Sequence, residues 1–200
     1  MSGTFPATPK PKSSDLISEE KTVVSIAVSG KKQSRIIGGH MWTIKLTFPQ
    51  MLRATFAPIF AFVAGQRGQS ESFQIALEQF NTPQGVATGT PLVDGVHAVG
   101  DNTILCDAFT ASTTDIMKAG DIVKFASHTK VYMLTADSDS VALGATTLNI
   151  VPPLIEALAD NEAVTVSSVP FTVSLDNSVQ EWKTTNPNFS SYSVDLIESF

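Results

Sequence analysis

The middle of this sequence differs in texture from its two ends, and this difference constrains the fold more than any other feature. Five short β-prone runs, separated by Gly and Asp, lie in the middle at residues 102–106, 121–126, 130–136, 146–150 and 163–168. Short strands at such close spacing are typical of a small β-barrel. Longer alternating runs lie on both sides, so we expect a β-domain built from both chain ends with a barrel inserted between them.

These textures predict a mainly β fold with one short α-helix, divided into three parts. Residues 1–20 contain three prolines and no sustained period. They predict an extended N-terminal arm that is either a frayed terminus or ordered on a neighbouring subunit. Residues 21–87 together with 169–200 predict a β-sandwich or barrel platform, and residues 88–168 predict the small inserted β-barrel.

The platform part contains two β-prone runs and one helical run. Residues 22–29 and 41–48 are expected to pair with each other as antiparallel strands, and alternation in 41–48 places one face in the core. A helix is expected over residues 55–64, with Thr55 as N-cap, Pro58 in the first turn and Gly65 as the left-handed residue that ends it. Its apolar positions recur at helical spacing and predict a face that covers the sheet: Phe56, Ile59, Phe60 and Val63.

Charge and cysteine content argue against several classes of protein. Nineteen acidic residues against thirteen basic ones give a formal net charge of −6, which disfavours sequence-specific nucleic-acid binding. The single cysteine, Cys106, permits no internal disulfide. The longest apolar run, around residues 56–64, is too short to span a bilayer, and the first residues lack a signal-peptide pattern. We therefore expect no membrane insertion, and synthesis in a cytoplasm.

The sequence also lacks a recognisable catalytic or metal-binding pattern. His40, His97 and His128 lie far apart and in no metal-ligand spacing, and Cys106 lies in an apolar run where a buried thiol is expected. Residues 137–140 resemble the start of a calcium loop without the glycine and glutamate that complete one. The sequence therefore predicts no catalytic residue, no metal and no cofactor.

Three features have no evident use in a monomer: the N-terminal arm, the exposed edges of short strands, and the apolar C-terminal residues. Arms wrap around neighbours, strand edges pair, and closed rings hide both. We therefore expect an assembly interface that contains Leu16, Ile17, Leu196, Ile197 and Phe200.

Two groups of segments carry a family resemblance. The first group reads RIIGGHMWTIKLTFPQM at 35–51, FAPIFAF at 56–62 and QRGQSESF at 66–73. The second reads GDIVKF at 120–125, KVYML at 130–134, LNIVPPL at 148–154 and YSVDLIE at 192–198. In texture and order these segments resemble virion structural proteins of tailed bacteriophages, over roughly residues 35–198.

The resemblance implies a non-enzymatic structural subunit of a phage tail or baseplate, located in the virion after synthesis in the bacterial host cytoplasm. It also implies two kinds of partner. Copies of the same chain would form a cyclic ring around the tail tube or hub, and neighbouring tail or baseplate proteins would attach to it. In such a ring Arg67 could form an ion pair at a subunit boundary, or be merely solvated.

The sequence leaves three other functions open. A head–tail connector or collar subunit is the first. A carbohydrate-binding β-module for host recognition is the second, and it needs exposed aromatic side chains such as Trp182, Tyr192 or Tyr132 along a groove. The third is a hydrolase working with two carboxylates such as Asp121 and Glu156, although no motif supports it.

Overall fold

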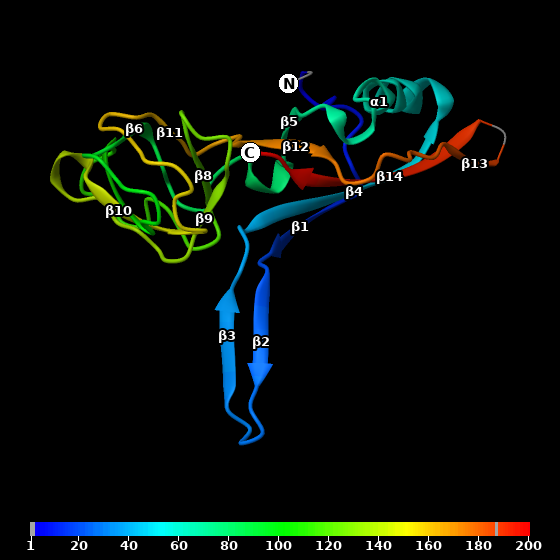
Figure 1. Ribbon diagram of the computed structural model, residues 1–200. Helices are drawn as coiled ribbons and strands as arrows, with labels where there is room; N and C mark the ends of the chain where they lie inside the picture. Colours follow the sequence, from blue (N-terminus) through cyan, green and yellow to red (C-terminus); the bar gives the residue numbers. More distant parts are fainter. Residues whose placement is uncertain (1–2, 187) are drawn as a thin grey trace. The chain divides into compact units, whose positions relative to one another are not determined.

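The computed structural model describes residues 3–186 and 188–200, and the chain divides into two compact units (Figure 1). The first contains Met1–Phe73 and Val173–Glu198, and we call it the platform. The second contains Gln74–Thr172 and Ser199–Phe200, and we call it the barrel. The first change of unit comes earlier than the sequence texture suggests, because residues 84–86 hydrogen-bond to loops of the barrel at Asp115 and Asp121.

The platform is built on one six-stranded sheet that draws its strands from both ends of the chain. Its strand order is β1-β4-β14-β12-β5, and β13 pairs with β14 beside this path. The strands are β1 (Ser13–Glu19), β4 (Met41–Leu52), β5 (Phe73–Ala76), β12 (Pro170–Leu175), β13 (Lys183–Asn186) and β14 (Phe189–Glu198). The boundary between the two units falls within β5 and within β12, so residues 74–76 and 170–172 of this sheet are counted with the barrel. Over the residues that the structure describes, the fold is mainly β with a single α-helix, as the sequence predicts.

The central strand β4 carries the core of the platform. Its alternation is confirmed, since Trp42, Ile44, Leu46 and Phe48 are buried while Lys45 is exposed. The neighbouring strand β14 alternates in the same way, and its Tyr192 stacks beside Phe48 with ring centroids 6.2 Å apart. Matching alternation on adjacent strands gives the sheet one apolar face and one polar face.

The apolar face is covered by the single helix α1 (Arg53–Gly65). Phe56, Ile59 and Val63 are buried as predicted, whereas Phe60 is only half-buried. The predicted ends of the helix are wrong. It begins two residues before Thr55, with Leu52 as N-cap and no capping side chain, so Pro58 lies inside the helix rather than in its first turn. Burial of the apolar face offsets the backbone hydrogen bond that this proline cannot make.

The end of the helix also differs from the prediction. Gly65 is still helical, Gln66 is the C-cap, and the left-handed residue is Arg67 at φ 54°. Gly68 follows in the left-handed region as well, and its position beside Ser178 leaves little room for a side chain. The reversal of the chain after α1 is therefore made by residues 67 and 68.

The N-terminal residues form part of the platform rather than a free arm. β1 pairs antiparallel with β4 along its whole length, with Leu16 opposite Ile44. Ahead of it, Phe5 is buried and its ring lies 6.2 Å from Phe48 and 5.6 Å from Phe62 between centroids. The prediction of an arm is wrong here because apolar residues near the terminus find partners within the same unit.

The expected pairing of residues 22–29 with 41–48 is also wrong. Both edges of β4 are taken, by β1 on one side and by β14 on the other. Residues 22–26 instead form β2 (Thr22–Ile26), which pairs with β3 (Lys32–Ile36) as a separate two-stranded sheet. Figure 1 shows this β2–β3 hairpin as the blue ribbon between β1 and β4 in the chain.

The barrel is a nearly closed six-stranded sheet with the order β11-β8-β9-β10-β7-β6. An isolated bridge joins Leu92, in one end strand, to Ala163, the residue just before the other end strand, and Val93 N–H donates to Glu162 O at 2.9 Å. The predicted small barrel is confirmed. Its strands are β6 (Gly89–Val93), β7 (Thr103–Phe109), β8 (Ile122–Phe125), β9 (Tyr132–Leu134), β10 (Thr146–Val151) and β11 (Val164–Thr165).

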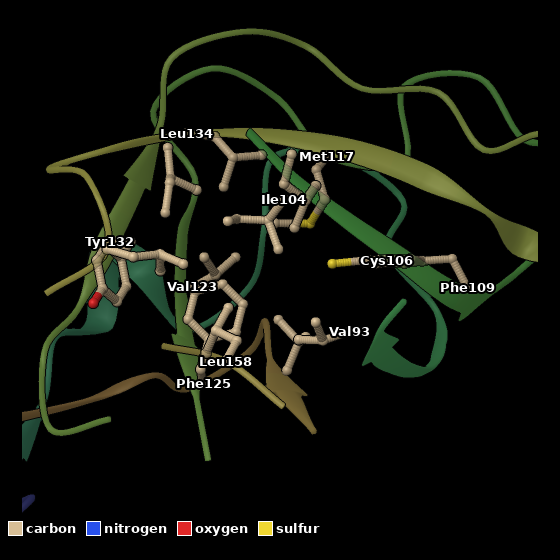
Figure 2. Packing of buried hydrophobic residues seen from close by; sticks show 14 of the residues in the cluster. Val93, Ile104, Cys106, Phe109, Met117, Val123, Phe125, Tyr132, Leu134 and Leu158 are labelled. Carbon is tan, nitrogen blue, oxygen red and sulfur yellow. The ribbon is translucent and has the colours of Figure 1, made fainter. Parts of the chain in front are cut away.

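One continuous cluster of buried side chains fills the barrel (Figure 2). Its residues come from all six strands, β6 to β11, and from the loops between them, so the strands surround a common core. Outside this cluster, short 3₁₀ turns lie at Gly68–Ser70 in the platform and at Glu78–Phe80 and Ala142–Gly144 in the barrel. The cluster contains Val93, Ile104, Cys106, Phe109, Ile116, Met117, Val123, Phe125, Tyr132, Leu134, Leu148, Ile150, Leu154, Leu158 and Val164.

Candidate assembly surface

The β2–β3 hairpin presents an apolar face that nothing covers among the described residues. Residues directly opposite each other on antiparallel strands share a face, so Val24, Ile26 and Ile36 lie together on one side of this ribbon. Their side chains are 47%, 70% and 60% exposed. A lone two-stranded hairpin is marginally stable in water, and an apolar face raises its demand for a partner.

The same hairpin is strongly basic. Residues 21–37 contain three lysines, one arginine and no acidic residue. All four side chains are exposed, and none forms an ion pair within the part of the chain that the structure describes. Lys32 lies opposite Ile26, so positive charge borders the apolar face near the hairpin turn.

The barrel has the opposite character. Residues 74–172 contain eleven acidic side chains and only three lysines, a net charge of −8. Each lysine is engaged within the barrel: Lys118 pairs with Asp115 at 3.2 Å, Lys124 donates to Pro170 O, and Lys130 is fully buried. The Lys130 Nζ lies 4.7 Å from the centre of the Phe200 ring. The exposed charge of the barrel is therefore almost entirely negative.

A groove of about 370 Å³ on the barrel brings acidic and apolar side chains together. Its carboxylates are Asp94, Asp137 and Asp139, and all three are exposed. Leu105 and Val141 line the same groove and are 46% and 61% exposed. Backbone N–H groups of Ala119 and Asp115 donate to Asp137 and Asp139, so these two carboxylates are held in fixed positions.

The C-terminal candidates of the predicted interface do not form one surface. Leu196 is fully buried opposite Ile44 in the platform sheet, so its side chain is not available to a partner and its assignment to the interface is wrong. Ile197 lies on the other face of β14 and is half-buried. Phe200 is 56% exposed and lies over Lys130.

The N-terminal candidates lie on the edge strand of the platform. Leu16 is half-buried on the core side of β1, and Ile17 is exposed on the opposite side. Arg67 is exposed, and it forms no ion pair within residues 3–186 and 188–200. Leu16, Ile17, Arg67, Ile197 and Phe200 stay predicted interface residues that no contact in a single chain tests.

The two carboxylates considered for catalysis have different surroundings. Asp121 is buried and accepts three backbone hydrogen bonds, from Gln84 at 2.7 Å, Lys118 at 2.8 Å and Gly85 at 3.4 Å. These bonds tie residues 84 and 85, which precede β6, to the turn at residues 118–121, which precedes β8, and this is a structural use of the charge. Glu156 is exposed on a different segment.

The single thiol is placed where nucleophilic chemistry is unfavourable. Burial, with smaller contributions from Asp107 and Asp94, raises the pKa of Cys106 from 9.0 to about 12. Figure 2 shows its sulfur directed into the apolar cluster of the barrel. The thiolate needed for reaction or metal binding is therefore disfavoured.

The three histidines and the aromatic side chains are mostly internal. His128 is buried with its Nδ1 2.7 Å from the Tyr132 hydroxyl, and the Nε2 of His97 accepts a hydrogen bond from the Leu105 N–H. Tyr132 and Tyr192 are buried, and burial raises the pKa of Tyr192. Of the three aromatics considered for a sugar platform, only Trp182 is partly exposed.

No group of three His, Cys, Asp or Glu side chains converges as metal ligands would within residues 3–186 and 188–200. In that same part of the chain, α1 is neither long nor apolar enough to cross a bilayer, and no other helix is.

Sequence reasoning missed the β2–β3 hairpin as an element and the charge contrast between it and the barrel. Both signals are present in the sequence. Lys31, Lys32 and Arg35 stand in a segment without acidic residues, and from Val131 to Trp182 the chain contains no lysine or arginine. Counting charge by segment, rather than over the whole chain, would have found them.

Comparison with known families gives a match that falls on the barrel. Residues 78–169 match the family described as distal tail protein pb9, B domain. No curated protein matches the chain. The matched segment covers a little under half of the sequence and lies inside the compact unit that we call the barrel. The match confirms that this chain resembles a distal-tail-like virion structural protein of tailed bacteriophages.

Proposed function

We propose that this protein is a structural subunit of a phage tail that assembles with copies of itself into a closed ring at the distal end of the tail. The match of residues 78–169 to a distal tail protein domain supports a tail structural subunit located in the virion. Ring formation around the tail tube or hub, and attachment to neighbouring tail or baseplate proteins, are the further content of the proposal.

The observation that carries the ring is the β2–β3 hairpin. It buries no side chain in its own chain, yet it exposes Val24, Ile26 and Ile36 on one face. An apolar ribbon of this kind gains stability only by docking on another surface. If that surface belongs to the next copy, the contact is head-to-tail, and a head-to-tail contact that closes on itself produces a ring.

The edge strand β1 offers a second means of joining copies. β1 is the end of the platform sheet, so one side of its backbone has no strand partner among the described residues. Exposed edges either need protection or serve to extend a sheet into a neighbour. Assembly with other subunits would pair the free edge of β1 and cover the apolar face of the hairpin.

The experiment measures mass in solution and removes the hairpin. Deleting residues 21–37 joins Glu20 to Gly38, and the two glycines at 38 and 39 then form a short connection between β1 and β4, which are already paired at Glu19 and Met41. The full chain is expected to form a multi-subunit species and the deletion variant a monomer whose free energy of unfolding equals that of the dissociated full chain.

The matched control is Lys183→Glu, a charge change on an exposed platform residue away from the hairpin. It is expected to leave the mass unchanged and to change stability by no more than about 1 kcal/mol, because the ion pair that it removes, with Glu181 at 3.2 Å, is exposed. A full chain that stays monomeric at every concentration tested, and that does not enter rings when mixed with tail tube protein, would contradict the proposal.

A further inference from the structure

The β2–β3 hairpin has an exposed apolar face with a basic border, and the barrel has a groove with acidic and apolar walls. We infer that the hairpin of one copy docks in the groove formed by Asp94, Leu105, Asp137, Asp139 and Val141 on the barrel of the next copy. This inference rests on the proposed ring, because it names the surface through which copies would join.

Charge decides between the two surfaces that could receive the hairpin. The barrel carries −8 over residues 74–172. The platform without its hairpin, which is the remainder of the chain, has eight acidic and six basic residues and so carries only −2. A segment with four positive charges and no negative one is attracted far more strongly to the barrel.

The groove also matches the hairpin in its apolar content. Leu105 and Val141 are exposed beside the three carboxylates, as Ile26 is exposed beside Lys32 on the hairpin. Docking would cover apolar atoms on both surfaces while each ammonium meets a carboxylate at the rim. Apolar contact at the centre with charges around it is the usual arrangement of a specific protein interface.

Two carboxylates of the groove are preorganised to bind a cationic partner. Asp137 and Asp139 are already oriented by backbone N–H donors at 2.8 Å and 2.7 Å. All three lysines of residues 74–172 are engaged elsewhere, so no internal cation neutralises these carboxylates. Carboxylates that are fixed in advance lose little entropy when they bind a cation.

The test reverses the charges on each side and then on both. Lys31→Glu with Lys32→Glu changes the hairpin. Asp94→Lys with Thr147→Lys changes the groove, and it leaves alone the carboxylates that hold the backbone. Each pair of substitutions is expected to raise the dissociation constant of the assembly by at least about tenfold, and all four in one chain should restore it to within about threefold. Glu156→Lys, an exposed barrel residue outside the groove, is the control and should change nothing.

A crosslink locates the contact directly. Two differently tagged full chains, one with Ile26→Cys and one with Thr147→Cys, are mixed and treated with a short thiol crosslinker. Cys106 is buried with a raised pKa and stays unreactive. A heterodimer joined through these two positions, absent with Glu156→Cys in place of Thr147→Cys, is the expected product.

The outcomes separate this inference from the proposed function. If the full chain assembles, loses assembly without its hairpin, and is indifferent to the groove substitutions, the ring stands and the inference is overturned. If the assembled mixture gives no heterodimer joined through residues 26 and 147, the inference is also overturned. If the full chain never assembles, the proposed ring and the inference are both wrong.

Discussion

The barrel and the β2–β3 hairpin differ in how their apolar side chains are kept from water. The barrel closes its own sheet through the Leu92–Ala163 bridge and covers its apolar side chains with its own strands. Its loops are tied by internal carboxylates such as Asp121. The hairpin has only two strands, and all of their residues are exposed. The barrel therefore needs no partner to cover its apolar side chains, whereas the hairpin does, and the hairpin is the part expected to contact other subunits.

The largest loss of barrel stability is expected from Gly144→Ala. Gly144 has a φ of 75°, and a Cβ there would overlap the backbone carbonyl of Phe109. Strain and overlap together are expected to cost about 4 kcal/mol or more, which is enough to unfold the barrel. Chemical denaturation followed by hydrogen exchange would show the loss. Gly95→Ala has a similar φ of 81° in open space, and should cost only about 1 kcal/mol.

Phe56→Ala tests whether the platform holds its own core as firmly as the barrel does. Phe56 is fully buried and contacts Trp182 and Tyr192, with ring centroids 4.8 Å and 5.3 Å away. Its truncation is expected to cost about 3–5 kcal/mol in denaturant unfolding. Phe60→Ala is the comparison variant, and it should cost clearly less because Phe60 is only half-buried. Equal losses would contradict this placement of the helix.

Asp121→Asn weakens the loop closure of the barrel without changing its size. An amide offers one acceptor oxygen where the carboxylate accepts bonds from Gln84, Gly85 and Lys118. Loss of charge-assisted bonds is expected to lower stability by about 2–3 kcal/mol. Faster amide exchange at residues 84, 85 and 118 would identify the cause, and unchanged exchange there would contradict it.

Replacing Glu162 should have a smaller, pH-dependent effect on the stability of the barrel. Burial acts to raise its pKa, but hydrogen bonds from Ser127 and from the Ala159 N–H outweigh burial and hold the pKa below its ordinary value of 4.5. Its contribution to stability is therefore complete above pH 4.5 and is lost as the pH falls through the lowered pKa. Because Glu162 is only half-buried and solvent weakens its interactions, Glu162→Gln should cost below about 1 kcal/mol at pH 7. Unfolding curves at pH 3 and pH 7 should then differ less than for the unchanged chain.

The smallest effect is expected in the hairpin itself. Ile26→Ser replaces an apolar side chain that is 70% exposed in the single chain. The free energy of unfolding of the dissociated protein should change by no more than about 0.5 kcal/mol. Assembly measured by mass should fall at the same time. A large loss of stability in the monomer would show that the hairpin packs on its own chain.

Sequence patterns predicted the parts of the fold whose signals are local. Each of the five short runs of the middle segment overlaps one strand of the barrel, and alternation in residues 41–48 correctly gave the buried face of β4. Helical spacing found α1, although its ends were misjudged because Leu52 caps without a side-chain hydrogen bond.

Pairing between distant segments could not be predicted in the same way. Which strand lies beside β4 depends on the alternation of β14, more than 130 residues later in the chain, and on the burial of Phe5 near the N-terminus. The assembly candidates suffered most, since alternation alone does not reveal that Leu196 fills the core while Ile197 faces outward. The charge of the hairpin and of the barrel was readable from the sequence but was hidden in the total of −6.

The chain leaves the platform sheet after β5 and returns to it at β12, and these two strands are neighbours in that sheet. A scaffold with exit and entry side by side can host a different cassette, or a plain turn, without rebuilding its own framework. Grafting an unrelated module between Ala76 and Pro170 should therefore leave the host sheet able to form, which makes this position a natural point for diversification.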